Sequence, residues 1–342
     1  MLTNMPHKIL IIGPSWIGDM VMAQSLFRLL KQQNPDAMID VLAPAWTFSL
    51  LSCMQEVNQA IEMPITHGEL KLGARYQLAK KLRANQYDQA IVLPNSFKSA
   101  LIPLFAGIPK RTGWLGEFRH FILNDARRLN KKRYPLMIEQ YMALGLEPNQ
   151  PLPSSYPYPE FTVAKAAQEA VLAKLKPLWR GRPVLALGAG AAFGSAKRWP
   201  EEYFAEIANQ KLAEGWDIWL FGSEGDRPIT NKIMQMTDQA CENISGRTVL
   251  SETIALLSLV SGVLTNDSGL MHMAAALKKP IIALYGPTSP SFTPPLAADA
   301  SILKLNLACQ PCFARECPLE HHRCMRDLTP VSVLQTMMAW RV

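Results

Sequence analysis

The residues His7-Lys8-Ile9-Leu10-Ile11-Ile12-Gly13 form a short apolar run that ends in glycine. Such a run is typical of a parallel strand that is buried on both faces of a sheet. A turn from Pro14 to Asp19 follows, and from Met20 to Lys31 the apolar residues recur at helical spacing. Strand, glycine-containing turn and helix in this order predict the start of a doubly wound α/β fold.

The same alternation continues to a proline-rich segment in the middle of the chain. Strands are expected over 38–42 and 89–93, with a charged helix over 70–85 between them. The segment 148–159 holds five prolines in twelve residues, which excludes helix or central strand and indicates an extended linker. We therefore predict one domain over 1–160 and a second over 161–342.

The second half repeats the pattern of the first. Its expected strands are 183–187, 216–221, 262–265 and 280–285. Its expected helices are 200–214, 229–236, 251–260 and 269–277. Two α/β halves of similar size predict two Rossmann-like domains that face a cleft.

Composition excludes several classes of protein. The 342 residues are 49% hydrophobic and 18% charged, which argues against disorder and a coiled coil. The uncharged run from Pro280 to Ala298 contains five prolines, so it cannot be a spanning helix. The first seven residues lack the apolar segment of a signal peptide, and we expect a cytoplasmic protein.

The net charge of +7 is unevenly distributed. The stretch Lys110–Arg133 carries eight Lys and Arg residues against Glu117 and Asp125. It is either an anion-binding surface or the solvated face of a helix. Composition alone leaves both interpretations open.

The segment Thr265-Asn266-Asp267-Ser268-Gly269-Leu270-Met271-His272 is the first candidate site. It places the end of a strand directly before a helix that Asp267 or Ser268 can cap. The first N–H groups of that helix and its dipole favour an anion, Gly269 allows close approach, and His272 follows one turn later. We interpret it as a diphosphate site; the alternative is an ordinary capped helix with a structural histidine.

Two further strand ends of this domain carry compatible groups. Lys197 follows a Gly/Ala loop and precedes the helix that begins at Pro200, a position at the rim where ligands bind in open sheets. Gly286 follows the strand 280–285. Asp226 is placed to bind ribose hydroxyls, or is simply an exposed loop residue.

In the first domain, Asp19 is the candidate catalytic residue. It enters the helix after the first strand, where a carboxylate can accept a proton from a substrate hydroxyl or merely favour the helix start. The turn before it matches neither Walker A nor Gly-x-Gly-x-x-Gly. Asp40 lies about twenty residues on, as in dinucleotide sites, but inside its strand, which disfavours NAD.

Metal chemistry is indicated only near the C-terminus. The sequence has no Asp-x-Asp triplet, and a helix start with Lys197 can neutralise a leaving diphosphate without a metal. Four cysteines cluster as Cys309-x₂-Cys312-x₄-Cys317-x₆-Cys324. Their spacing is compatible with a structural zinc, an iron–sulfur cluster or free thiols.

Several motifs together resemble glycosyltransferase family 9, the ADP-heptose-dependent lipopolysaccharide heptosyltransferases with a GT-B fold. The resemblance covers nearly the whole chain. The motifs that carry it are Ile11–Met20, Leu93–Ser99, Gly107–Trp114, Lys197–Pro200, Thr265–His272 and Tyr285–Pro287. The Cys309–Cys324 segment is a departure that the transferase chemistry does not require.

The resemblance implies a single inverting displacement. Heptose would move from ADP-heptose to the first heptose of the lipopolysaccharide inner core, with Asp19 as the base. The residues implied in donor binding are Lys197, Asp226, Asp267, Ser268, Gly269, His272 and Gly286. Those implied in acceptor binding are Gly18, Asn95, Ser96 and Lys98.

The partners follow from the same resemblance. The acceptor would be an anionic glycolipid at the cytoplasmic face of the inner membrane, and the basic stretch, including Arg127 and Arg128, would guide it. We expect a monomer at this membrane, with no nucleic-acid partner and no catalytic cofactor, though with zinc as a candidate at the cysteines. The alternatives are a family member with another acceptor and, more remotely, an NAD-type oxidoreductase or a nucleic-acid binder.

Overall fold

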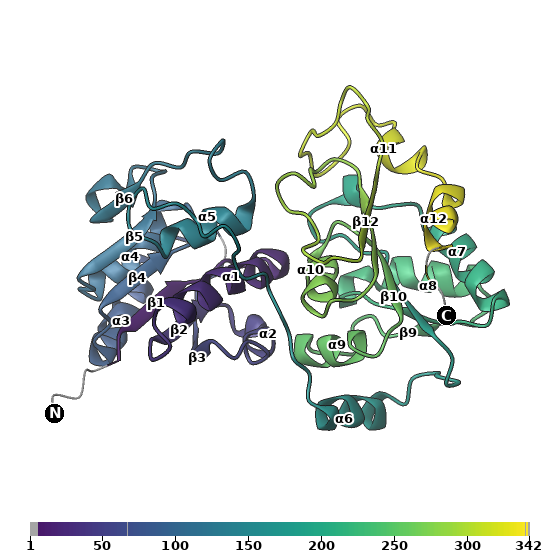
Figure 1. Ribbon diagram of the computed structural model, residues 1–342, viewed down its shortest axis with the longest axis horizontal. Helices are drawn as coiled ribbons and strands as arrows, with labels where there is room; N and C mark the ends of the chain where they lie inside the picture. Colours follow the sequence, from purple (N-terminus) through teal and green to yellow (C-terminus); the bar gives the residue numbers. More distant parts are fainter. Residues whose placement is uncertain (1–5, 67, 339, 341–342) are drawn as a thin grey trace. The chain divides into compact units, whose positions relative to one another are not determined.

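The computed structural model describes residues 6–66, 68–338 and 340. The chain divides into two units, Met1–Pro159 and Glu160–Val342, each built on its own six-stranded sheet (Figure 1). All strand pairings in both sheets are parallel. The expected doubly wound α/β architecture is therefore confirmed for both halves.

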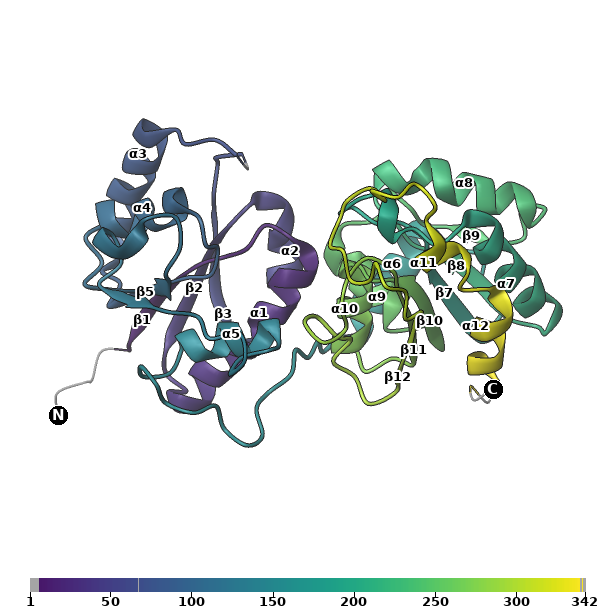
Figure 2. The same ribbon diagram turned by 90° about the horizontal axis from the view of Figure 1, so that it is seen from above.

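The first unit alternates strands and helices. Its strands are β1 (Lys8–Ile12), β2 (Met38–Ala43), β3 (Val57–Glu62), β4 (Gln89–Val92), β5 (Lys110–Trp114) and β6 (Asp125–Arg127). Its α-helices are α1 (Ile17–Gln33), α2 (Phe48–Leu51), α3 (Leu72–Leu82), α4 (Phe97–Phe105) and α5 (Met137–Leu144). Figure 2 shows α3 and α4 on one side of this sheet and α1 and α5 on the other.

The second unit repeats the arrangement. Its strands are β7 (Val184–Gly188), β8 (Asp217–Leu220), β9 (Glu242–Asn243), β10 (Gly262–Asn266), β11 (Ile281–Tyr285) and β12 (Ala300–Lys304). Its α-helices are α6 (Lys165–Leu175), α7 (Glu201–Ala213), α8 (Arg227–Met236), α9 (Leu250–Leu257), α10 (Gly269–Ala276), α11 (Arg323–Arg326) and α12 (Pro330–Met337).

Strand order fixes where each unit can bind a ligand. The orders are β3-β2-β1-β4-β5-β6 and β12-β11-β10-β7-β8-β9. The chain therefore reverses its winding direction between β1 and β4 in the first sheet, and between β7 and β10 in the second. In open α/β sheets the loops at the carboxyl ends of such strands diverge and leave a ligand-binding crevice.

Apolar side chains of the strands make the two cores. Leu10, Ile12 and Val92 are buried in the first unit, and Leu187, Leu264 and Leu284 in the second. Burial on both faces explains why the central strands were readable as continuous apolar runs. None of the helices in the described ranges combines the length and apolar character needed to cross a membrane.

The basic stretch Lys110–Arg133 is not a helix face. It contains the two edge-side strands β5 and β6, with a single 3₁₀ turn, Arg119–Phe121, between them. The interpretation as a solvated helix is therefore wrong. The two strands were not predicted because they are too polar to show an apolar pattern. Their register, Thr112 with Asp125 and Trp114 with Arg127, is set by pairing within the sheet.

Candidate functional site

Three loops of the second unit meet at the carboxylate of Asp267. Lys197 ends a 3₁₀ turn, Ser195–Lys197, and its Nζ lies 2.6 Å from Asp267 Oδ2. The hydroxyl of Thr288 donates to the same oxygen at 2.6 Å. The loops after β7, β10 and β11 are thus joined at the point where the sheet reverses its winding.

Asn266 fixes the geometry of this junction, although the sequence analysis did not single it out. Its side chain is fully buried and donates to the Ala189 carbonyl at 2.9 Å, while accepting from the backbone N–H of Trp199 at 3.2 Å. The indole of Trp199 in turn donates to the Leu328 carbonyl at 2.7 Å. The only sequence signal was a polar residue at the end of an apolar strand.

Helix α10 begins immediately after Asp267. Ser268 is its N-cap residue, but no side chain makes a capping hydrogen bond there. Ser268 thus takes the expected N-cap position, but without the side-chain hydrogen bond of a cap: Asp267 is engaged by Lys197, and Ser268 Oγ lies 3.2 Å from Thr265 Oγ1. An uncapped helix start that includes Gly269 leaves N–H groups and a positive dipole end for an anion.

His272 lies one turn into α10 and is buried. Burial lowers its pKa to about 4; the Asp267 charge opposes this shift, and the Lys197 cation adds a smaller lowering contribution. The ring is therefore neutral near pH 7. It can donate or accept a hydrogen bond at the site, but it adds no positive charge for a phosphate.

A second cation, Arg315, lies beside Lys197. The Lys197 ammonium is 5.0 Å and the Arg315 guanidinium 5.5 Å from the centre of the Phe193 ring. The Arg315 carbonyl accepts a hydrogen bond of 3.0 Å from the N–H of Ala196, which fixes this residue against the 3₁₀ turn. Arg315 was missed because it lies within the Cys309–Cys324 segment, which was considered only for its cysteines.

Two of the expected donor residues have structural partners. Asp226 Oδ2 accepts hydrogen bonds from the backbone and side chain of Ser223, which closes a capping box before α8. Gly286 packs so tightly that a Cβ would lie 2.5 Å from Met325 Sδ. Its carbonyl accepts from Gln310 Nε2 at 2.7 Å.

In the first unit, Gly18 and Asp19 lie in the first turn of α1, at the carboxyl end of β1. The N-terminal turn of a helix favours an ionised carboxylate through the helix dipole. Asp19 also contributes, after burial, to the strong increase of the pKa of Tyr141 on α5, so its charge lies near that ring. Gly18 and Asp19 therefore lie on one side of the winding reversal between β1 and β4.

The loop after β4 holds the expected acceptor residues on the other side of that reversal. Ser96 is the N-cap of α4, and Lys98 lies half-buried in its first turn. Asn95 Oδ1 accepts a hydrogen bond from Arg119 Nη2 at 3.1 Å. Strand order therefore brings the loops of Gly18–Asp19 and Asn95–Lys98 to adjacent strand ends.

Much of the basic stretch is structural rather than available to a ligand. Arg127 forms two hydrogen bonds to Asp125 and donates to the Ala143 and Leu146 carbonyls. Arg119 is fully buried. The expectation that Arg127 guides the acceptor is wrong for this reason. The exposed cations that remain at the end of the stretch are Arg128, Lys131, Lys132 and Arg133.

Asp40 has a structural role that argues against a dinucleotide site. It is buried inside β2, where it accepts from the Tyr87 hydroxyl at 2.6 Å and from Asn58 Nδ2 at 2.8 Å. Both carboxylate oxygens are thus engaged within the first unit. An acid that binds ribose would instead end its strand and face the ligand.

The cysteine segment braces the loops of the second unit. The N–H of Phe313 donates to the Pro287 carbonyl at 2.8 Å. The pKa of the Cys324 thiol is raised to about 11 by burial and then by the neighbouring thiols of Cys317, Cys309 and Cys312. Among the described residues, no group of three or more His, Cys, Asp and Glu side chains has an arrangement that could hold a metal ion.

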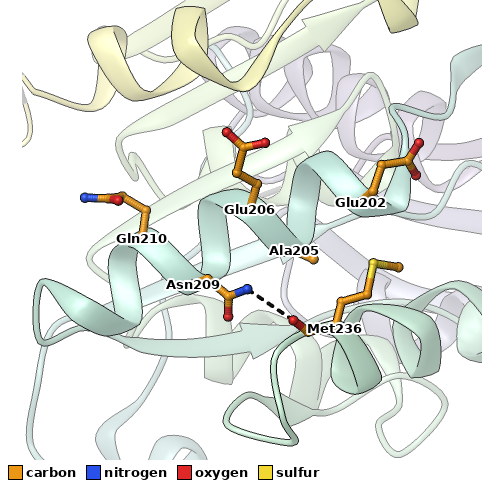
Figure 3. A pocket seen from close by; sticks show the side chains of 6 residues that line it. All are labelled: Glu202, Ala205, Glu206, Asn209, Gln210 and Met236. Carbon is orange, nitrogen blue, oxygen red and sulfur yellow. Dashed lines mark hydrogen bonds between the residues drawn. The ribbon is translucent and has the colours of Figure 1, made fainter.

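A surface depression between α7 and α8 lies apart from these loops (Figure 3). Glu202 and Glu206 point outward from α7, and Asn209 donates to the Met236 carbonyl at 3.1 Å. Two carboxylates on a solvated helix face repel phosphate, so the depression does not fit an anionic ligand.

Two Rossmann-like units, each with a six-stranded parallel sheet and polar groups at its winding reversal, have the architecture of GT-B glycosyltransferases. A family model described as glycosyltransferase family 9 (heptosyltransferase) matches residues 75–323. The chain belongs to glycosyltransferase family 9.

Similar proteins extend the comparison over the whole chain. It is 46% identical to lipopolysaccharide heptosyltransferase 2 of Escherichia coli K12, over 97% of this chain and 98% of that protein. It is also 46% identical to lipooligosaccharide heptosyltransferase 2 of Haemophilus influenzae, over 96% and 98%. The solved structure of the E. coli ADP-heptose LPS heptosyltransferase II superposes with a TM-score of 0.88 at 44% identity, covering 97% of this chain and 98% of that one.

Proposed function

We propose that the enzyme transfers L-glycero-D-manno-heptose from ADP-heptose to the first heptose of the lipopolysaccharide inner core. The observation that carries this assignment is the 46% identity, over nearly the full length of both chains, to a lipopolysaccharide heptosyltransferase 2. Heptose transfer in lipopolysaccharide core synthesis accounts for an anion site in one unit and a helix-start carboxylate in the other.

The donor diphosphate would bind where Lys197, Thr288 and the start of α10 converge. Lys197 forms an ion pair with Asp267 at 2.6 Å. The oxygens of a diphosphate would attract the Lys197 ammonium. The N–H groups at Ser268 and Gly269 would donate hydrogen bonds to other phosphate oxygens. Arg315, His272, Asp226 and Gly286 complete the proposed donor surface, His272 as a neutral hydrogen-bonding group and Gly286 through its position in the loop.

Asp19 would act as the general base in a single displacement. Its carboxylate takes the proton of the acceptor hydroxyl as that oxygen bonds to the anomeric carbon of the heptose. The bond from this carbon to the diphosphate breaks, and ADP leaves with the electron pair. Since the incoming oxygen attacks opposite the leaving group, the anomeric configuration inverts.

The acceptor would contact Gly18, Asn95, Ser96 and Lys98 around Asp19. Arg128 and Lys131–Arg133 are the cations that remain to attract its phosphate and carboxylate groups. Such an acceptor is anchored in a membrane by its lipid, which supports action at the cytoplasmic face of the inner membrane.

Catalysis by these residues requires no metal, because Lys197 and a helix start supply the charge that a cation would otherwise provide. We place zinc only at Cys309, Cys312, Cys317 and Cys324, whose thiols are the donors zinc prefers. The described arrangement does not hold three of them around one point. Metal content of the purified protein, with and without chelator, tests this assignment, and protein without bound zinc at full activity rejects it.

The activity is tested by heptose transfer from ADP-heptose, with EDTA present, to two acceptors. One is Kdo₂-lipid A that already bears a heptose, and the other lacks it. We expect turnover on the first alone, and a loss of about 10²–10⁴-fold in Asp19→Asn with ADP affinity retained. Turnover on the bare acceptor, or on neither, would contradict the proposed acceptor.

A further inference from the structure

Two phenylalanines of the first unit are exposed far beyond the other aromatic side chains. Phe118 is 83% and Phe121 85% exposed, whereas the other exposed aromatic side chains in the described ranges are 38% to 51% exposed. Both lie in the loop between β5 and β6, on either side of Arg119. Such apolar exposure is unfavourable in water, and so points to a partner surface.

The loop that carries these rings is held by a buried guanidinium. Arg119 is fully buried and donates to the Pro94 carbonyl at 2.7 Å, to Asn95 Oδ1 and to the Trp114 carbonyl. The 3₁₀ turn Arg119–Phe121 closes with a hydrogen bond of 3.0 Å from the N–H of Ile122. A charged side chain is expensive to bury, and here it fixes a segment, 117–121, whose exposed residues are Glu117, His120 and the two phenylalanines.

Phe118 itself adopts a left-handed backbone conformation, with φ of 58°. This region is unfavourable for a residue with a bulky side chain. The strain is maintained at a position where the side chain makes little contact with its own protein. The rings are therefore presented outward by the fold rather than left there by a loose loop.

A positively charged loop leaves the same sheet edge from the neighbouring strand. β6 pairs with β5 in parallel, so the segments that follow Trp114 and Arg127 start at adjacent strand ends. The second segment, 128–138, contains no acidic residue. Its exposed cations are Arg128, Lys131, Lys132 and Arg133.

Other exposed aromatic residues continue this edge across the sheet. Trp46 follows β2, Trp16 follows β1 and Phe97 follows β4. Their order along the sheet is therefore Trp46, Trp16, Phe97 and then the Phe118–Phe121 turn. The row passes the loops of Asp19 and Asn95 and ends at the basic loop.

We propose that the Phe118–Phe121 turn and the 128–133 loop dock the first unit onto an anionic lipid bilayer. Aromatic rings beside Lys and Arg match the chemistry of the membrane interface, where the rings enter among the acyl chains and the cations pair with anionic headgroups. A symmetric contact between two copies would bring four cations of each face together, which disfavours self-association. This inference rests on the proposed function only for its purpose, the delivery of a lipid-anchored acceptor to Asp19.

Vesicle co-sedimentation tests the docking surface without either substrate. The vesicles are phosphatidylethanolamine with about one quarter phosphatidylglycerol, against vesicles of phosphatidylcholine alone. We expect the full-length protein to bind the anionic vesicles, and Phe118→Ser/Phe121→Ser to bind them at least about tenfold more weakly. Met338→Ser is the matched control, because this side chain is 81% exposed in the second unit.

A second pair of variants tests the charge. Lys131→Glu/Lys132→Glu should weaken binding to the anionic vesicles about tenfold, and more so at low salt. The control is Lys80→Glu/Lys81→Glu, an exposed pair at the end of α3. Because α3 leads into β4, this pair lies toward the amino ends of the strands, away from the proposed docking surface. Equal losses of vesicle binding in the two double variants would show that binding depends only on the net charge of the protein, and would overturn the proposal.

Activity separates this inference from the proposed function. On a deacylated, water-soluble acceptor Phe118→Ser/Phe121→Ser and the two control variants should work as the wild type does, which also shows that they are folded. Lys131→Glu/Lys132→Glu changes cations proposed to attract the acceptor, so its folding is checked by wild-type ADP affinity instead. Wild-type vesicle binding in the Phe118/Phe121 variant overturns the docking surface. The docking surface is also overturned if this variant changes its oligomeric state, or loses binding to an acidic protein, while its vesicle binding stays unchanged. Vesicle binding without heptose transfer to any acceptor would refute the proposed function alone.

Discussion

His272 shows how burial selects the chemistry of a single residue. The sequence placed it in a phosphate-binding segment, where a histidine invites interpretation as a cation. Burial lowers its pKa to about 4 despite the nearby Asp267 charge, which makes it a neutral group instead. The positive charge at this site therefore rests on Lys197, Arg315 and the start of α10.

The depressed pKa of His272 predicts a pH dependence of stability. The unfolded chain binds a proton near pH 6.5 and the folded protein only near pH 4. The contribution of the neutral ring is therefore complete above about pH 6.5 and is lost as the pH falls toward 4. The shift corresponds to about 3 kcal/mol in the free energy of unfolding.

Urea unfolding of the wild type and His272→Gln between pH 4 and 7.5 measures this contribution. The wild type should lose stability more steeply than the variant below pH 6.5, and the two slopes should agree above it. Parallel slopes throughout would show that the pKa of the ring is the same in the folded and the unfolded chain, and would contradict the lowered value.

At the scale of elements, β6 is held by side-chain hydrogen bonds more than by apolar packing. Within this three-residue edge strand Arg127 donates to Asp125 at 2.6 Å, and it joins the strand to α5 through the Ala143 carbonyl at 2.7 Å. Burial alone would raise the pKa of Asp125, but hydrogen bonds from Arg127 and Thr112 lower it. The low pKa of the Asp125 carboxyl therefore depends on the hydrogen bonds that it accepts, above all from Arg127.

We expect Arg127→Ala to lower the free energy of unfolding by about 3 kcal/mol, because it leaves a half-buried carboxylate without its cation. Arg128→Ala, at an exposed neighbour, should change it by less than about 0.5 kcal/mol. Urea unfolding at pH 7 gives both values. A loss in Arg128→Ala as large as in Arg127→Ala would contradict the assigned roles.

The elements also show what could be predicted from sequence. The strands β1, β4, β7 and β11 were predictable because burial on both faces makes them continuously apolar. β5 and β6 were not, since Lys110, Arg111 and Arg127 place charges in strands at the sheet edge. The buried roles of Arg119 and Asn266 depend on carbonyls from distant loops, which no local pattern reveals.

At the scale of the whole molecule, each unit brings its candidate residues to its own winding reversal. The motif at Thr265–His272 and the lysine at position 197 are about seventy residues apart, but β7 and β10 are neighbours in the sheet. Strand order therefore explains why motifs recognised separately form one site. In the proposed mechanism the groups that bind the diphosphate therefore belong to the second unit, and the base to the first.

This division predicts separable effects on ADP binding. ADP at about 100 times its dissociation constant should stabilise the wild type by about 2.7 kcal/mol, and Asp19→Asn by the same amount. Lys197→Met should bind ADP at least about tenfold more weakly, since it removes a charge-assisted hydrogen bond to phosphate. Without ligand this variant should also be less stable than the wild type, because Asp267 loses a partner at 2.6 Å.

Calorimetric titration at a temperature where every variant is folded measures the affinity apart from the stability. Lys197→Arg serves as the matched control: it keeps a cation near Asp267, and so should retain more of the stability than Lys197→Met. A loss of ADP affinity in Asp19→Asn equal to that in Lys197→Met would place the base among the diphosphate ligands. The division between the units would then be wrong, because a carboxylate that only accepts the acceptor proton has no contact with ADP to lose.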